Sequence, residues 1–83
     1  MTAAEHDHIT RVKSLPCSVC NAAPYSDAHE INQGQWFTSI PLCVDCHTGS
    51  KNGIHGRKIM WKIMKKDELS CLDETIRKLF YTR

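Results

Sequence analysis

Apolar residues at helical spacing open the chain. Ile9, Val12 and Leu15 are three residues apart and share one face of a helix, while the residues between them are polar. Pro16 follows directly, and its ring and missing N–H cannot continue a helix. The pattern therefore predicts a short leading helix over residues 7–15.

The same periodicity returns in the C-terminal third. After a loop rich in Gly and Asn at residues 48–53, the spacing predicts a helix over about residues 55–66. Its expected apolar face pairs Ile59 with Ile63 and Met60 with Met64. Asp67 can cap a further helix, in which Cys71 is expected to be a small buried residue. The expected apolar stripe of this last helix is Leu69, Leu72, Ile76, Leu79 and Phe80.

Between these helices the pattern changes to two short extended runs. The first lies around residues 27–31, and the second, residues 36–40, is rich in β-formers and ends at Pro41. The Asn, Gln and Gly residues at positions 32–35 are typical of a turn. We therefore expect a two-stranded hairpin, with three aromatic residues as core: Trp36, Phe37 and Trp61.

The chain has 83 residues and a formal net charge of +2. A domain of this size has too little interior to be stable through apolar burial alone, so a metal or disulfides are expected. We predict one α+β domain over residues 1–83, with a knuckle and hairpin core over 15–56 and C-terminal helices over 56–81. The sequence shows neither a secretory leader nor an apolar run that could span a membrane, so we expect a cytoplasmic protein with no membrane partner.

Two Cys-x-x-Cys pairs, Cys17/Cys20 and Cys43/Cys46, are the strongest chemical signal. Four thiolates complete a tetrahedral shell around Zn²⁺, and a reducing cytosol disfavours disulfides. A redox role for one pair would leave the other unexplained. The pattern therefore predicts a structural zinc site built from all four cysteines.

Histidines near the cysteines are not needed in that shell. His29 precedes Glu30 on the first predicted strand, His47 follows Cys46 directly, and His55 comes next along the chain. An ion held by such side chains keeps open positions for water and substrate, as catalytic metal sites do. We therefore predict a second, reactive metal site with three candidate ligands: His29, His47 and His55.

Taken together, the motifs resemble those of the HNH (ββα-metal) endonucleases. The matching segments are Cys17-x2-Cys20, Ala28-His29-Glu30-Ile31, Ile40-Pro41-Leu42-Cys43-Val44-Asp45-Cys46-His47 and Gly53-Ile54-His55-Gly56. Within that family the chain resembles the small phage and prophage branch, similar to the recombination-enhancement nuclease Ref. The resemblance covers nearly the whole chain.

This resemblance implies hydrolysis of DNA phosphodiester bonds with one divalent ion, Mg²⁺, Mn²⁺ or another first-row metal. It implies that His47 is a metal ligand. Two registers remain open for the general base: either His29 is a ligand and Glu30 is the base, or His29 is the base and the other ligand lies elsewhere. It also implies the host cytoplasm as location, and a recombination or packaging protein of the phage or host as partner.

Basic residues after the second cysteine pair are the candidates for contact with DNA phosphates: Lys51, Arg57 and Lys58. Two other functions fit the same sequence. One is a catalytically silent zinc-knuckle module that binds DNA, and the other is a protein-interaction adaptor that presents its last helix, as a monomer or a dimer. A nuclease requires the histidines to converge in one cavity separate from the cysteines, whereas the alternatives leave them scattered.

Overall fold

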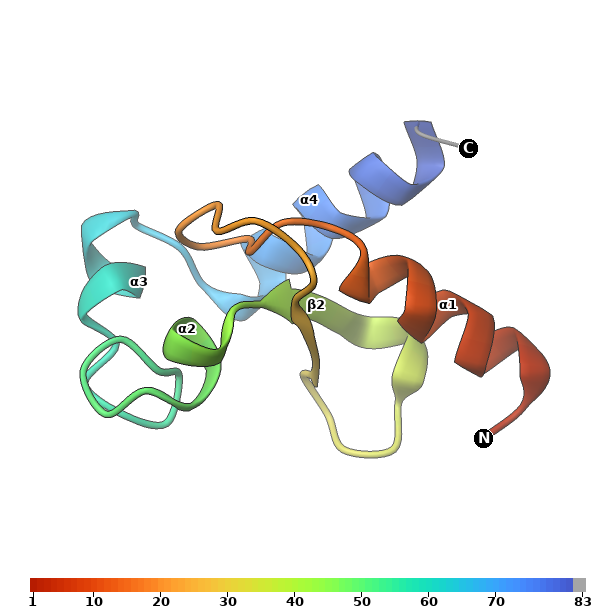
Figure 1. Ribbon diagram of the computed structural model, residues 1–83, viewed down its shortest axis with the longest axis horizontal. Coiled ribbons are helices and arrows are strands. Elements are labelled where there is room, and N and C mark those ends of the chain that lie inside the picture. The colour runs from red at the N-terminus through yellow and green to blue at the C-terminus, as the bar shows by residue number, and fades with distance from the viewer. Residues whose placement is uncertain (82–83) are drawn as a thin grey trace.

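The computed structural model describes residues 1–81 and begins with helix α1, Ala3–Lys13 (Figure 1). The Thr2 hydroxyl accepts a hydrogen bond from the Glu5 N–H at 3.1 Å, and Glu5 Oε1 accepts one from the Thr2 N–H at 2.7 Å. This reciprocal capping box starts the helix at Ala3, so the predicted start at residue 7 is wrong. Val12 is fully buried, which agrees with the predicted face.

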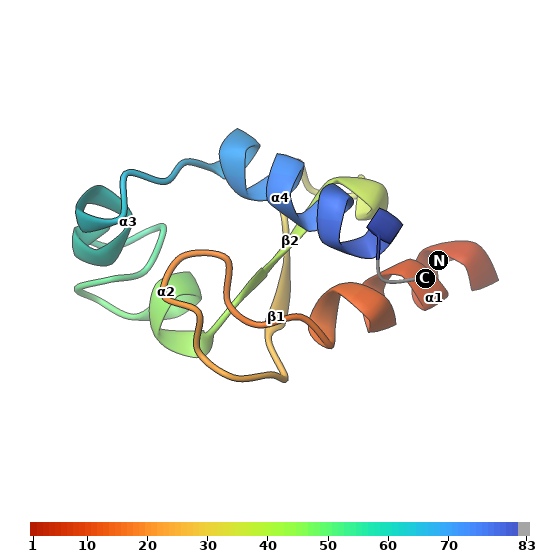
Figure 2. The ribbon, with the colours of Figure 1, turned by 90° about the horizontal axis from the view of Figure 1, so that it is seen from above.

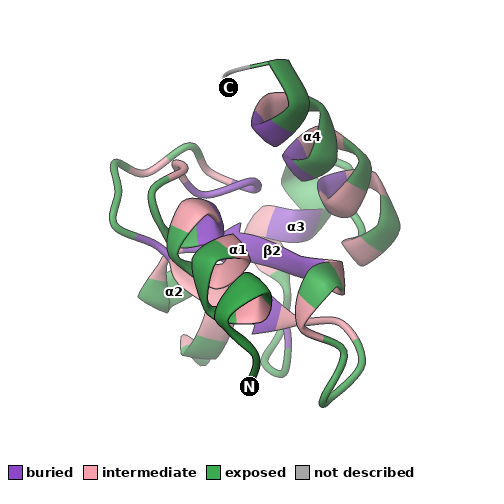
Figure 3. Cartoon of the chain, turned by 90° about the vertical axis from the view of Figure 1, so that its right-hand side faces the viewer, coloured by how far each residue is buried: buried purple, intermediate pink, exposed green. Residues whose placement is uncertain are grey.

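Strands β1, Asp27–Glu30, and β2, Ser39–Leu42, form the predicted antiparallel hairpin. In its register His29 is opposite Ile40. All residues of β2 are buried, and both α1 and α4 (Glu68–Tyr81) pack against this strand. Figure 3 shows β2 as a buried strand in the middle of the molecule, with the exposed faces of α1 and α4 turned outward.

The second strand begins later than predicted, because residues Trp36–Thr38 form a 3-10 helix, η1. The Thr38 N–H and hydroxyl both donate to the Gln35 carbonyl, and the Ser39 hydroxyl donates to the Trp36 carbonyl at 2.7 Å. Hydroxyl side chains that bond nearby backbone in this way favour a turn over a strand. Phe37 is 52% exposed as a result, so its predicted place in the core is wrong.

The predicted helix over residues 55–66 is also shorter than expected. Helix α2, Val44–Thr48, precedes a long loop, and helix α3 covers Ile59–Ile63 alone. Lys58 and Lys65 flank α3 with left-handed backbone, at φ 56° and 53°. The residue that anchors α3 is Trp61, which is buried and donates its indole N–H to the Cys46 carbonyl at 3.1 Å. The predicted apolar face is wrong, because Ile63 and Met64 are exposed.

The last helix, α4, begins as predicted after Asp67. Asp67 Oδ1 accepts from the Ser70 N–H at 2.7 Å, and the Ser70 hydroxyl accepts from the Asp67 N–H at 3.1 Å. The buried face of α4 consists of Cys71, Thr75 and Leu79. Of the predicted stripe, three members are exposed, so that part of the prediction is wrong: Leu69, Ile76 and Phe80.

A buried threonine explains the shifted face. The Thr75 hydroxyl donates to the Cys71 carbonyl at 2.7 Å, so Thr75 satisfies its polar group inside the helix and can be buried. Seen from above, α2 and α3 lie at one end of the molecule and α1 at the other, with the hairpin between them (Figure 2). None of the helices within residues 1–81 has the length and apolar character that a membrane crossing requires.

The packing of α1 leads to a prediction about pH. His8 Nε2 is buried and has no hydrogen-bond partner among the described residues, and burial, with the nearby Arg11 charge, lowers the pKa of His8 below its ordinary 6.5. The unfolded chain therefore binds more protons than the folded chain just below about pH 6.5, and the free energy of unfolding should rise with pH through that window.

We expect this rise to be smaller in His8→Leu than in the wild type. The measurement is urea denaturation of both zinc-saturated proteins between about pH 5.5 and about pH 7.5, where histidine titrates. The remaining histidines are common to both proteins, so the difference between the two curves isolates His8. Parallel curves would contradict the prediction.

Candidate functional site

The four cysteines of the two Cys-x-x-Cys pairs meet at one point, as predicted. Their sulfur atoms lie within 4.8 Å of one another, and the Cys20 and Cys43 sulfurs are 3.6 Å apart. A tetrahedral Zn²⁺ with bonds of about 2.3 Å places its sulfur ligands about 3.8 Å apart. None of the cysteines, all of which lie within residues 1–81, forms a disulfide. The cluster is therefore consistent with a zinc site.

Each Cys-x-x-Cys pair lies in a tight turn, a zinc knuckle, that backbone hydrogen bonds stabilise. In the first, the Val19 N–H donates to Cys17 Sγ at 3.4 Å and Asn21 adopts left-handed backbone at φ 62°. In the second, Cys43 caps α2, and its sulfur accepts from the Cys46 N–H at 3.4 Å. The Ser18 N–H joins the first knuckle to β2 through the Pro41 carbonyl at 2.9 Å.

The pKa values of the thiols in this cluster are shifted in different directions. Burial raises the pKa of Cys20 and Cys46, and neighbouring sulfurs raise them further. Burial also acts on Cys17, but surrounding backbone N–H groups outweigh it and lower its pKa to about 7. Buried thiolates close together need a cation to compensate their charge, and thiolate sulfur is a preferred ligand of Zn²⁺.

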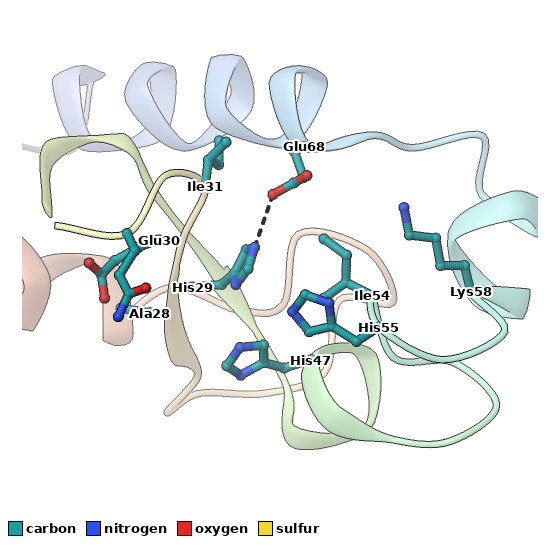
Figure 4. Close-up of a pocket in the computed structure, with 10 residues that line it drawn as sticks. Ala28, His29, Glu30, Ile31, His47, Ile54, His55, Lys58 and Glu68 are labelled. Carbon is teal, nitrogen blue, oxygen red and sulfur yellow. Dashed lines mark hydrogen bonds and ion pairs between the residues drawn. The ribbon is translucent and has the colours of Figure 1, made fainter. Parts of the chain in front are cut away.

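A cavity of about 530 Å³, shown in Figure 4, is lined by none of the four cysteines. Three histidines from different elements line it: His29 from β1, His47 from α2 and His55 from the loop before α3. The ring centroids of His29 and His47 are 5.1 Å apart, and those of His29 and His55 are 6.2 Å apart. The structure thus brings together the three histidines that the sequence singled out.

The loop that carries His55 is tied to α2, which carries His47. The Ile54 N–H donates to the Cys46 carbonyl at 3.0 Å, directly before His55. Gly56 is packed so closely that an added methyl group would meet the carbonyl oxygens of Gly49 and Ser50. The cysteine cluster and this loop therefore fix His47 and His55 relative to each other.

Two carboxylates that contact these histidines were not singled out in the sequence analysis. Asp27 Oδ2 lies 3.0 Å from His47 Nδ1, and Glu68 Oε2 lies 3.0 Å from His29 Nε2. Asp27 could have been found, because it is two positions before His29 and alternate residues of a strand share a face. Glu68 could not, since no local pattern connects α4 with β1.

Glu30 lines the same cavity, but its carboxylate is directed elsewhere. Glu30 Oε1 accepts a hydrogen bond from the Gly34 N–H in the hairpin turn at 2.8 Å. Figure 4 shows Glu30 on the side of β1 opposite to His29. Adjacent residues of a strand point to opposite faces, so His29 and Glu30 cannot act from the same position.

All three basic candidates are exposed, and of the three Lys58 lines the cavity. The Lys58 ammonium lies 5.9 Å from the centroid of the Trp61 ring, within the range of a cation–π contact. This contact holds a positive charge at the edge of the cavity.

The cysteine cluster and the histidine cluster differ in how closely their ligating atoms are spaced. Within residues 1–81 the cysteines are the one set of three or more Cys, His, Asp or Glu side chains whose ligating atoms come within 4.8 Å of one another. The histidines converge on the cavity without reaching that spacing.

A search with this chain matches no protein-family model, no curated protein and no solved structure.

Proposed function

We propose that this protein is a metal-dependent DNA endonuclease of the HNH (ββα-metal) type. The observation that carries the proposal is the convergence of three histidines from three elements on one cavity, apart from the four cysteines. A zinc module needs the cysteine cluster alone. A hydrolytic site needs a base, metal ligands and room for a phosphate, and the histidines that line the cavity and its volume of about 530 Å³ support this proposal.

In this proposal His29 is the general base. A histidine is poised for proton transfer near neutral pH, whereas the Glu30 carboxylate is engaged with the hairpin turn. Nδ1 of His29 takes a proton from a water molecule while the water oxygen forms a bond to phosphorus. The bond from phosphorus to the leaving oxygen breaks, and that oxygen keeps the electron pair and is protonated by solvent.

His47 and His55 are the proposed metal ligands. Asp27 accepts the Nδ1–H of His47, which leaves Nε2 of His47 free to coordinate, an arrangement common among metal-binding histidines. A bound Mg²⁺ or Mn²⁺ would stabilise negative charge on the phosphate and on the leaving oxygen. Lys58 at the cavity edge, with Lys51 and Arg57 beside it, would hold the DNA backbone.

Nicking of supercoiled plasmid tests the proposal. The zinc-loaded protein should nick DNA when Mg²⁺ or Mn²⁺ is added, and His47→Ala should lower the rate by ~100-fold or more, because it removes a metal ligand. His6→Ala is the matched control, since His6 is exposed on α1, away from the cavity. Unchanged nicking by His47→Ala would contradict the site.

A zinc-knuckle module that binds DNA without cutting it is the second candidate. It is favoured by the wider spacing of the histidine cluster, whose ligating atoms do not come within 4.8 Å of one another as those of the cysteines do. The same assay separates the two functions. Plasmid retardation without nicking in any added divalent metal would favour the module.

A further inference from the structure

Glu68 joins the last helix to the cavity. Its Oε2 atom lies 3.0 Å from His29 Nε2, and the two side chains are 34% and 10% exposed. Figure 4 shows the His29 ring between Glu68 on one side and His47 on the other. Through this contact α4 meets one of the predicted reactive residues.

The start of α4 fixes the backbone position of Glu68. It is the first residue of α4, directly after Asp67, whose mutual hydrogen bonds with Ser70 fix the start of the helix. Cys71 and Thr75 then bury the next turns of α4 against the core. A carboxylate held in this way can restrict the side chain that it contacts, because its own backbone cannot shift.

The contact also selects a protonation form of His29. A neutral imidazole carries its proton on one ring nitrogen, and a carboxylate can only accept a hydrogen bond. The pairing with Glu68 therefore places the proton on Nε2 and leaves the lone pair on Nδ1. Rotation of the ring by half a turn would lose the hydrogen bond and direct the wrong atom to the water.

We propose that Glu68 is a positioning residue that holds the His29 ring so that its unprotonated Nδ1 faces the cavity. The inference rests on the proposed nuclease function, in which His29 is the base. Asp27 makes the equivalent contact with His47, so each of these two histidines has a carboxylate on the ring nitrogen that it does not use. The C-terminal helix is thereby part of the site and not only of the core.

The test compares Glu68→Gln with Glu74→Gln in the zinc-loaded protein. Glutamine has the shape of glutamate, but its amide can donate as well as accept, so it tolerates both forms of the His29 ring. Glu74 is the matched control, because it lies on the same helix and pairs with Lys66 outside the cavity. Two quantities are measured: the ¹⁵N chemical shifts of the His29 ring at about pH 8, above the ordinary pKa of histidine, and kcat and KM for plasmid nicking.

In the wild type and in Glu74→Gln we expect the proton of His29 on Nε2. In Glu68→Gln we expect a mixture of both forms, with kcat ~10- to 100-fold lower and KM little changed. A His29 ring that keeps its Nε2 proton in Glu68→Gln would overturn the inference, whatever the nicking rate. A shifted ring in a protein whose wild type cuts no DNA would uphold the contact and reject the nuclease proposal, so the two failures are distinguishable.

Discussion

Replacing Cys20 by serine is expected to abolish zinc retention and to unfold the domain. The four sulfurs lie within 4.8 Å of one another, and Cys17 and Cys46 are themselves buried in the core beside Ile40, Leu42 and Trp61. Binding of a structural Zn²⁺ contributes ~10 to 16 kcal/mol, which is comparable to the whole stability of a small domain, ~5 to 15 kcal/mol. A serine hydroxyl is a poor zinc ligand, so the loss should exceed the stability that remains.

The measurement is zinc content per chain together with the thermal melt followed by circular dichroism. Cys71→Ala is the matched control, because Cys71 is buried in α4 but lies outside the cluster. Its loss leaves only a small cavity, at a cost of about 1 kcal/mol, and one zinc per chain should remain. One zinc and a cooperative melt in Cys20→Ser would show that the four cysteines do not act as a unit.

The second large effect is expected at the proposed base. His29→Ala should lower plasmid nicking by ~100- to 10,000-fold, the range that general base catalysis contributes. The His29 side chain is 10% exposed, so its removal should also lower the stability of the fold. This loss of stability should be small, because the main partner of the side chain is a single carboxylate. Zinc content and melting temperature measured beside the nicking rate separate the two effects.

Glu30→Gln is the control that distinguishes the two possible bases. It keeps the shape of the side chain, and its amide oxygen can still accept the Gly34 N–H, so nicking should stay within a few-fold of the wild type. A Glu30→Gln protein as slow as His29→Ala would assign the base to Glu30 instead. Full activity in His29→Ala would remove His29 from the reaction.

Several parts of this molecule could be predicted because their signals are local. The Cys-x-x-Cys pairs and the hairpin between them depend on spacing and turn residues that are a few positions apart. The cap of α4 at Asp67 is equally local. The capping box at Thr2 and Glu5 is also local, and it starts the leading helix at Ala3, before the residue 7 that the apolar spacing alone predicts.

Other parts could not be predicted because competing contacts come from distant residues. The buried face of α4 depends on Thr75 satisfying its hydroxyl within the helix, which frees the more apolar Leu69 and Ile76 to remain exposed. Helix α3 is short because the chain before it bonds to the loop: the Arg57 N–H donates to the Ser50 carbonyl at 3.1 Å. Apolar periodicity shows which face of a helix is apolar, but not which face packs against another element of the fold.

The candidate site divides in the same way. The sequence by itself determined which side chains are candidate metal ligands or bases, because the cysteine pairs and the nearby histidines are identified by residue type and spacing. Only the tertiary structure decided which atoms face one another: it set Asp27 against His47, brought Glu68 from α4 to His29, and turned Glu30 away to the hairpin turn. Ligand identity follows from residue type, whereas the orientation of an imidazole depends on a hydrogen bond that long-range packing supplies.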